Sequence, residues 1–190
     1  EESREFLDDI IRTSKESENV LFVSGFSSIG FFAYLFKEIY LDKNSKTKNI
    51  KLILGNEISK SSYIIQDEVK HHFEENSFDY YYFTGIELLK KFIEDKNKLD
   101  KELGFSKKIN LEVRIETGER RLHAKIFVFD NHVIFGSSNL SYSGTVEQLE
   151  INKKVKKDIE LVEFSKVKEI AEAYWNSKTA IDYKKELLEV

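Results

Sequence analysis

The chain has 190 residues, a formal net charge of −4 from 30 basic and 34 acidic side chains, and no cysteine. This length is enough to bury a core without disulfide or metal support. The absence of cysteine excludes disulfides, Cys-ligated zinc and thiol catalysis. Net charge alone does not indicate a nucleic-acid-binding domain, so any contact with nucleic acid must come from a local patch or from the meeting of two chains.

No segment has the composition of a targeting or membrane-spanning sequence. Residues 1–18 are mostly charged and polar, and the apolar stretch 29–41 is short and is interrupted by Lys37 and Glu38. We therefore expect a soluble, cytoplasmic protein without a membrane partner. Because no repeat or linker is evident, a single domain over 1–190 is predicted. The chain begins at Glu1 and contains no Met, so we expect it to be a fragment of a larger protein.

The first half of the chain predicts helices alternating with strands. Apolar residues at helical spacing predict helices over 3–16 and 29–40. Apolar runs that end at a glycine predict buried strands over 19–24 and 49–54. This order is typical of a right-handed strand–helix–strand unit with two parallel strands.

The second half predicts further helices and then a group of strands. Charged, amphipathic segments predict helices over 61–74 and 85–103. Strands are predicted over 110–116, 122–130, 133–135 and 149–155, a tight turn at Asn131–His132, and closing helices over 164–175 and 181–188. The whole predicts an α/β fold with a mixed, largely parallel β-sheet flanked by helices on both faces.

Two basic side chains, His123 and Lys125, lie two residues apart in one predicted strand. Because side chains alternate along a strand, both should face the same side of the sheet. A core disfavours an unpaired lysine, whereas an anion site uses the ammonium charge and an imidazole as nucleophile or acid. Gly136 then allows a close approach of the backbone to a ligand. Neutral donors suited to phosphate oxygens follow it: Ser137, Ser138 and Asn139.

This segment resembles the motif of the phospholipase D superfamily: His-x-Lys, four residues, Asp, six residues, then Gly-Ser-x-Asn. Here His123-Ala-Lys125 is followed after four residues by Asp130 and after five more by Gly136-Ser-Ser-Asn139. Because the second interval is one residue short, Asp130 either belongs to the site or only shapes the turn. The resemblance also implies that Glu150, eleven residues past Asn139, orients the histidine.

The resemblance covers most of the chain and is strongest to single-motif nucleases of this superfamily, namely phospholipase D-type restriction endonucleases and helicase-associated domains. It implies a DNA nuclease that uses neither a metal nor a cofactor, and a homodimer in which two copies share one active site. One His123 is then expected to form a covalent phosphohistidine while the other protonates the leaving oxygen, with Lys125 and Asn139 stabilising the charge. A DNA-recognition or helicase domain outside this chain is expected as well.

Other histidines and aromatic residues have structural interpretations that we favour over functional ones. His71 and His72 lie in a charged helical segment, where solvation is favoured over metal binding. His132 is assigned to a turn. The aromatic run 80–83 favours a core or strand position over base stacking.

Basic residues near the motif leave more than one interpretation open. The lysines of 153–157 fit an exposed strand edge or a phosphate-contacting patch equally well. Arg120 and Arg121 directly precede the motif, and we favour a contact of Arg121 with the substrate backbone. Two alternative functions also remain: a lipid or RNA phosphodiesterase, and a catalytically silent module that binds a nucleic-acid backbone.

Overall fold

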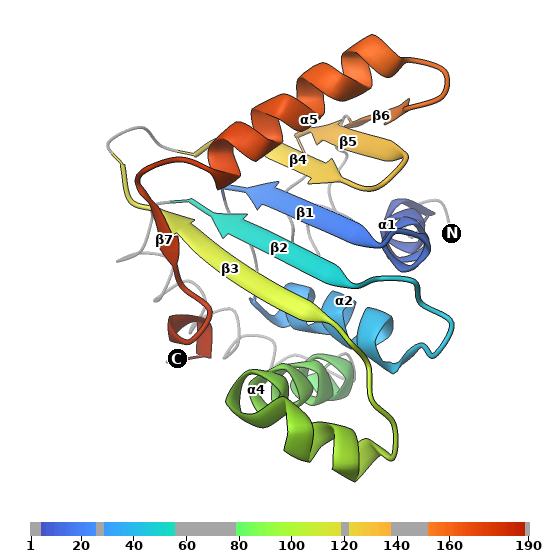
Figure 1. The fold of residues 1–190 in the computed structure, drawn as a ribbon, viewed down its shortest axis with the longest axis vertical. Helices are drawn as coiled ribbons and strands as arrows, with labels where there is room; N and C mark the ends of the chain where they lie inside the picture. Colours follow the sequence, from blue (N-terminus) through green and yellow to red (C-terminus); the bar gives the residue numbers. More distant parts are fainter. Residues whose placement is uncertain (1–4, 26–28, 56–78, 119–121, 138–151, 189–190) are drawn as a thin grey trace.

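The computed structural model describes residues 5–25, 29–55, 79–118, 122–137 and 152–188. Its helices are α1 (Glu5–Glu16), α2 (Ile29–Leu41), α4 (Asp79–Leu103) and α5 (Leu161–Trp175), with a 3₁₀ helix at Glu186–Leu188 (Figure 1). Its strands are β1 (Asn19–Ser24), β2 (Asn49–Leu54), β3 (Asn110–Glu116), β4 (Lys125–Val128), β5 (His132–Gly136), β6 (Asn152–Lys156) and β7 (Ala180–Asp182). Helix α4 is kinked at Asp95, which has φ −158° and ψ 88°.

Within the described ranges the strands form a seven-stranded sheet in the order β6-β5-β4-β1-β2-β3-β7. Strands β1, β2 and β3 are mutually parallel, and α2 connects β1 to β2. The outer pairings, β1 with β4, β4 with β5, β5 with β6 and β3 with β7, are antiparallel. The predicted mixed α/β sheet is confirmed, but it is not largely parallel: only the central strands β1, β2 and β3 run parallel, and the other four described pairings are antiparallel.

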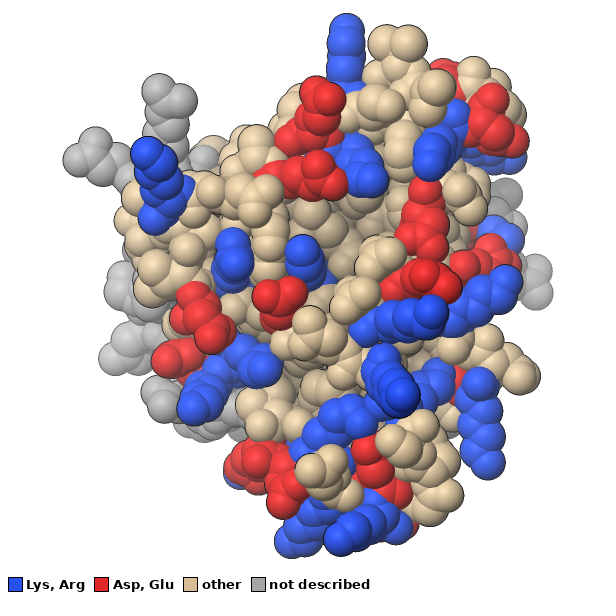
Figure 2. Space-filling view, viewed as in Figure 1, with Lys and Arg blue, Asp and Glu red and all other residues tan. Residues whose placement is uncertain are grey.

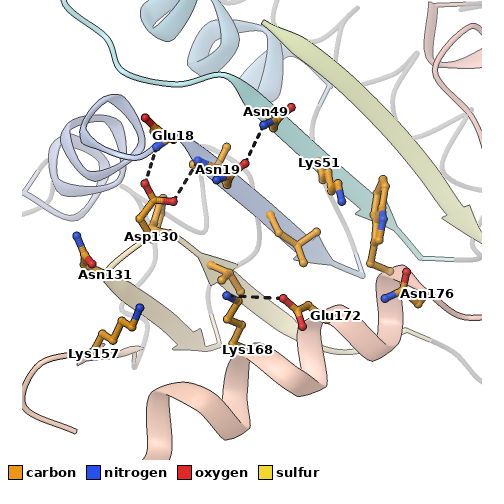
Figure 3. Close-up of a pocket in the computed structure, with 15 residues that line it drawn as sticks. Glu18, Asn19, Asn49, Lys51, Asp130, Asn131, Lys157, Lys168, Glu172 and Asn176 are labelled. Carbon is orange, nitrogen blue, oxygen red and sulfur yellow. Dashed lines mark hydrogen bonds and ion pairs between the residues drawn. The ribbon is translucent and has the colours of Figure 1, made fainter. Parts of the chain in front are cut away.

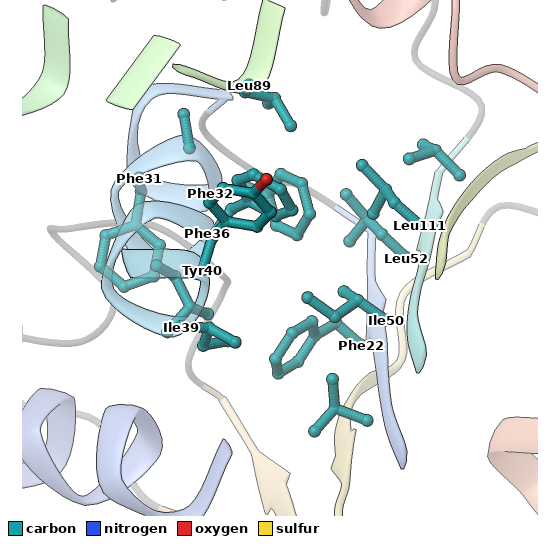
Figure 4. Packing of buried hydrophobic residues seen from close by; sticks show 14 of the residues in the cluster. Phe22, Phe31, Phe32, Phe36, Ile39, Tyr40, Ile50, Leu52, Leu89 and Leu111 are labelled. Atoms are coloured by element: carbon teal, nitrogen blue, oxygen red, sulfur yellow. The ribbon is translucent and has the colours of Figure 1, made fainter. Parts of the chain in front are cut away.

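The larger core lies between the sheet and helices α1, α2 and α4. Helix α2 is apolar around most of its circumference because it packs against the sheet on one side and α4 on another. Phe32 and Phe36 of α2 lie over Phe22 and Leu52 of the sheet (Figure 4). Phe22 also makes an edge-to-face contact with Phe127, with ring centroids 5.9 Å apart.

Helix α5 covers the opposite face of the sheet and completes the three layers (Figure 1). Its buried residues fall on one stripe at intervals of three or four positions: Phe164, Val167, Ala171 and Trp175. They pack with Leu21, Val23 and Val155 of the strands beneath. The expectation of helices on both faces is therefore confirmed.

Several predicted elements differ from the structure at their ends or in their type. The predicted helix over 181–188 is wrong: Ala180–Asp182 forms β7, in which Ile181 pairs with Ile115, and only the 3₁₀ helix follows. The aromatic run 80–83, for which a core or strand position was predicted, lies in the helix α4 and not in a strand. The predicted helix over 61–74 lies outside the described residues. In the described part of the chain, no helix is long and apolar enough to cross a membrane.

Candidate active site

The motif segment lies at the edge of the sheet where β1, β2 and β3 end and β4 begins. Because β4 runs antiparallel to β1, its first residue Lys125 pairs with Ser24, the last residue of β1. Strand β5 ends at the same edge, where Gly136 pairs with Asn152 of β6. Ligand sites of α/β sheets commonly lie outside the carboxyl ends of the parallel strands. The topology therefore places the motif where such a site is expected.

His123 and Lys125 face the same side of the sheet, although β4 begins later than predicted. The strand starts at Lys125 rather than at residue 122, because β1 ends at Ser24; just beyond it, the N–H of Gly25 donates to the carbonyl of Ala124 at 3.3 Å. Leu122 and Ala124 pack into the core under α5. The alternation then directs His123, which is exposed, and Lys125, which is half-buried, to the other side.

The backbone before His123 is held by a close approach that requires glycine. A Cβ on Gly25 would lie 2.1 Å from the carbonyl oxygen of Leu122. A Cβ on Gly55 would lie 2.6 Å from the carbonyl oxygen of Gly25. Both distances are shorter than non-bonded contacts allow, so a side chain at either position would displace the neighbouring backbone. The ends of β1 and β2 thus fix the position of the histidine's backbone.

The ammonium of Lys125 lies beside the backbone of the histidine. Its Nζ donates to the carbonyl oxygen of His123 at 3.3 Å. Among the described residues, this hydrogen bond engages one of the three donors of the ammonium group. An exposed imidazole and an ammonium on the same side of the chain can meet one phosphate, the imidazole as nucleophile or acid and the ammonium as charge stabiliser.

The remaining predicted site residues divide into those the structure describes and those it does not. Ser137 follows β5 directly and is exposed at the same edge as Lys125. Four predicted site residues lie outside the described residues: Arg121, Ser138, Asn139 and Glu150.

Asp130 lies at the other end of β4, away from His123 and Lys125. Its two carboxylate oxygens accept hydrogen bonds from the backbone N–H groups of Glu18 and Asn19, at 2.7 and 3.1 Å. These bonds join the β4–β5 turn to the start of β1. Of the two roles left open by the sequence, the geometry therefore favours shaping the turn.

Glu116 is a buried carboxylate that the sequence did not single out. It ends β3 at the same edge as the motif and is only 6% exposed. Burial alone would raise its pKa, but hydrogen bonds from the hydroxyl of Thr179 and, at 2.8 Å, the N–H of Gly118 lower the pKa below its ordinary value. These contacts connect the end of β3 to the segment before β7, which indicates a structural role.

The structure also places His132 and two of the lysines considered in the sequence. His132 opens β5 at the edge opposite His123, and burial together with the charges of Lys154 and Lys156 lowers its pKa. Lys153 forms an ion pair with Glu163 at 2.7 Å, and Lys154 forms one with Asp9 at 2.9 Å. Since β6 is an outer strand of the described sheet, these contacts favour the strand-edge interpretation for Lys153 and Lys154, whereas Lys157 lies in the turn after β6.

The surface charge is mixed on the face that Figure 2 shows, where basic and acidic side chains are interspersed without a large area of one sign. Among the residues that the structure describes, no group of three His, Cys, Asp or Glu side chains gathers in a way that could hold a metal ion. His71 and His72, for which surface solvation is predicted, lie outside those residues.

Comparison with known proteins identifies one matching family and solved structures with a similar fold. Residues 44–175 match the family model described as cardiolipin synthase, phospholipase D-like domain. The fold is similar to that of NucT from Helicobacter pylori, with a TM-score of 0.51, 15% identity, and coverage of 95% of this chain and 92% of that chain. It is also similar to a phospholipase D family member, Nuc from Salmonella typhimurium, with a TM-score of 0.51, 14% identity, and coverage of 93% and 90%. No curated protein sequence matches the chain.

Proposed function

The chain belongs to the family of phospholipase D-like domains, and on this basis we propose that it is a metal-independent phosphodiester hydrolase that cuts DNA. The observation that carries the proposal is the exposed imidazole of His123 beside the ammonium of Lys125, where the parallel strands end. A nucleophile and a positive charge are the two groups that a metal-free displacement at phosphorus needs.

In the proposed reaction the imidazole of His123 attacks phosphorus, a phosphorus–oxygen bond breaks, and a covalent phosphohistidine forms. A second imidazole on the far side gives a proton to the leaving oxygen and then takes one from the water that releases the product. Lys125 and Asn139 supply donors to the phosphoryl oxygens, and Glu150 holds the imidazole in one tautomer. A restriction or helicase-linked enzyme is the setting that we propose for this activity.

The second imidazole is proposed to come from another copy of the chain. His132 lies at the opposite edge of the sheet and is therefore badly placed to act on the same phosphate. A two-fold axis beside His123 would bring the two equivalent histidines together and form one shared site from two chains. Mixing inactive His123→Ala chains into wild type should then depress activity beyond simple dilution. Activity strictly proportional to the wild-type fraction would refute a shared site.

The catalytic proposal is tested with a chromogenic diester, bis(p-nitrophenyl) phosphate, and with supercoiled plasmid, both in excess EDTA. His123→Ala should lose at least about a hundredfold in turnover while its unfolding temperature stays close to that of wild type, because the side chain is exposed. His132→Ala is the matched control, since it removes a histidine from the other end of the sheet. Wild-type rates in His123→Ala, or complete loss in EDTA with rescue by magnesium, would overturn the proposal.

A lipid phosphodiester is a second candidate substrate, because the description of the matching family model names cardiolipin synthase. Vesicles of phosphatidylglycerol or phosphatidylcholine, single-stranded RNA and plasmid, compared at equal phosphodiester concentration, separate the classes of substrate. Retention of plasmid on the protein without any cleavage would instead indicate a silent backbone-binding module.

A further inference from the structure

A cavity of about 630 Å³ lies beneath α5, away from the candidate active site (Figure 3). It is bounded by the C-terminal half of α5, the starts of β1 and β2, and the end of β4. Val128 lines it, whereas Lys125 at the other end of the same strand belongs to the motif edge. The cavity volume lies within the range of roughly 300–1,000 Å³ that is typical of small-molecule sites.

The carboxylates that line this cavity are already engaged with partners in the fold. Glu18 pairs with Lys48 at 3.1 Å, and Glu172 pairs with Lys168 at 3.8 Å. Asp130 accepts the two backbone N–H groups described above. Glu18 and Glu172 are therefore paired with lysines, and the carboxylate of Asp130 is held by backbone hydrogen bonds.

Two lysines of the lining, Lys51 and Lys157, have no ion pair among the described residues. The Nζ of Lys51 lies over the indole ring of Trp175, 5.2 Å from its centroid, and Glu112, opposite Lys51 on β3, forms no ion pair with it. Lys157 is exposed, with its Nζ 5.9 Å from the ring centroid of Phe164. An aromatic ring attracts a cation but does not neutralise it, so both ammonium groups keep their charge for an anion.

A further cation, Arg114, contacts Trp175, and several amides line the cavity. Arg114 stacks on Trp175 with its guanidinium carbon 4.2 Å from the ring centroid, which increases the positive charge beside Lys51. Asn49 Nδ2 donates to Asn19 Oδ1 at 2.8 Å, which holds this pair of side chains at the cavity wall (Figure 3). Apolar side chains from β1 and β4 also line the cavity: Leu21 and Val128.

We propose that this cavity binds a small phosphate-bearing anion, either inorganic phosphate or a phosphate monoester up to the size of a mononucleotide. In this proposal the ammonium groups of Lys51 and Lys157 pair with the phosphate charge. The asparagine amides hydrogen-bond to the polar groups of a bound monoester, and the side chains from β1 and β4 contact its apolar part. The site is separate from His123 and does not depend on the proposed phosphodiesterase activity.

Trp175 makes a direct test practical, because it is the single tryptophan of the chain and it lines the cavity. Its fluorescence is measured during titration with thymidine 5′-monophosphate, inorganic phosphate and uncharged thymidine. A saturable change is expected with one or both of the phosphates and none with thymidine. Saturation by the monophosphate alone assigns an organic phosphate, and equal saturation by both assigns the phosphate group itself.

Substitutions connect the signal to the two lysines. Lys157→Gln, at an exposed position, should weaken binding by on the order of tenfold, and adding Lys51→Gln should weaken it further. Lys166→Gln is the matched control, because this exposed lysine is on α5 but does not line the cavity. His123→Ala should bind as wild type does. No saturable change with either phosphate, or unchanged affinity in Lys157→Gln and in the double variant, would overturn the proposal.

Discussion

Replacing Asp130 with alanine separates a role in the turn from a role in catalysis. The substitution removes the acceptor of two backbone hydrogen bonds, from Glu18 at 2.7 Å and Asn19 at 3.1 Å. These N–H groups lie directly before and at the first residue of β1, so loss of the two hydrogen bonds loosens the junction between the start of β1 and the β4–β5 turn.

The expected loss of stability follows from the strength and exposure of these bonds. A hydrogen bond to a charged group contributes about 1.5–3 kcal/mol when water is excluded. The hydrogen bonds of Asp130 are exposed, so water can bond to the two N–H groups after the substitution and offset part of the loss. We therefore expect the free energy of unfolding to fall by about 1–2 kcal/mol in total. For a chain of this length that corresponds to a fall in unfolding temperature of roughly 2–8 °C.

The expected effect on turnover is small because Asp130 is far from the motif edge. Five residues of extended chain from Lys125 to Asp130 span about 16 Å, which is twice the distance of about 8 Å over which physiological salt screens charge. We therefore expect Asp130→Ala to hydrolyse bis(p-nitrophenyl) phosphate within about threefold of wild type below its unfolding temperature.

The assay combines thermal unfolding by circular dichroism with initial rates on the same preparations. Asp158→Ala is the control, because Asp158 is an exposed carboxylate in the turn after β6. A hundredfold loss of turnover in Asp130→Ala at unchanged unfolding temperature would refute this reasoning and place the carboxylate in the chemistry.

Two further substitutions test the edge of the sheet. Gly25→Ala places a Cβ 2.1 Å from the carbonyl oxygen of Leu122, so turnover should fall at least about tenfold through displacement of His123; rates equal to wild type would show that the backbone adjusts without cost. Glu116→Gln should cost about 1–3 kcal/mol at neutral pH. Because the folded-state pKa of Glu116 lies below its ordinary value of 4.5, its ionised form stabilises the fold above that value and loses this effect as the pH falls. The stability difference between wild type and Glu116→Gln, measured by urea unfolding, should therefore narrow below about pH 4, and a constant difference would contradict the assigned pKa shift.

The central strands could be predicted from the sequence because each is a compact apolar run with a clear end. The bounds predicted for β1 and β2 agree with the structure, since Gly25 and Gly55 mark where the chain leaves the sheet. The segment 180–182 gave no such signal. It forms a strand because it pairs with the backbone on the outer side of β3, and the Ile181 side chain remains 51% exposed there.

The candidate site was predictable where it depends on spacing along one strand. His123 and Lys125 share a side because Leu122 and Ala124 alternate with them into the core. The position of Asp130 was not predictable in the same way, because its partners lie more than a hundred residues away in sequence, at Glu18 and Asn19. The cavity under α5 was missed for a similar reason, since the two lysines proposed to bind the anion, Lys51 and Lys157, come from β2 and from the turn after β6.

The two outermost strands determine how copies of this sheet can associate. β7 is only three residues long, and β6 carries Lys153, Lys154 and Lys156 along its five residues. Short or lysine-bearing end strands are poor templates for the addition of another strand. Growth of a continuous intermolecular sheet, the route to fibrils, is therefore disfavoured at both sides. Two chains that meet around His123 would contact each other through the ends of their strands. Neither sheet would gain a further strand along its outer strands.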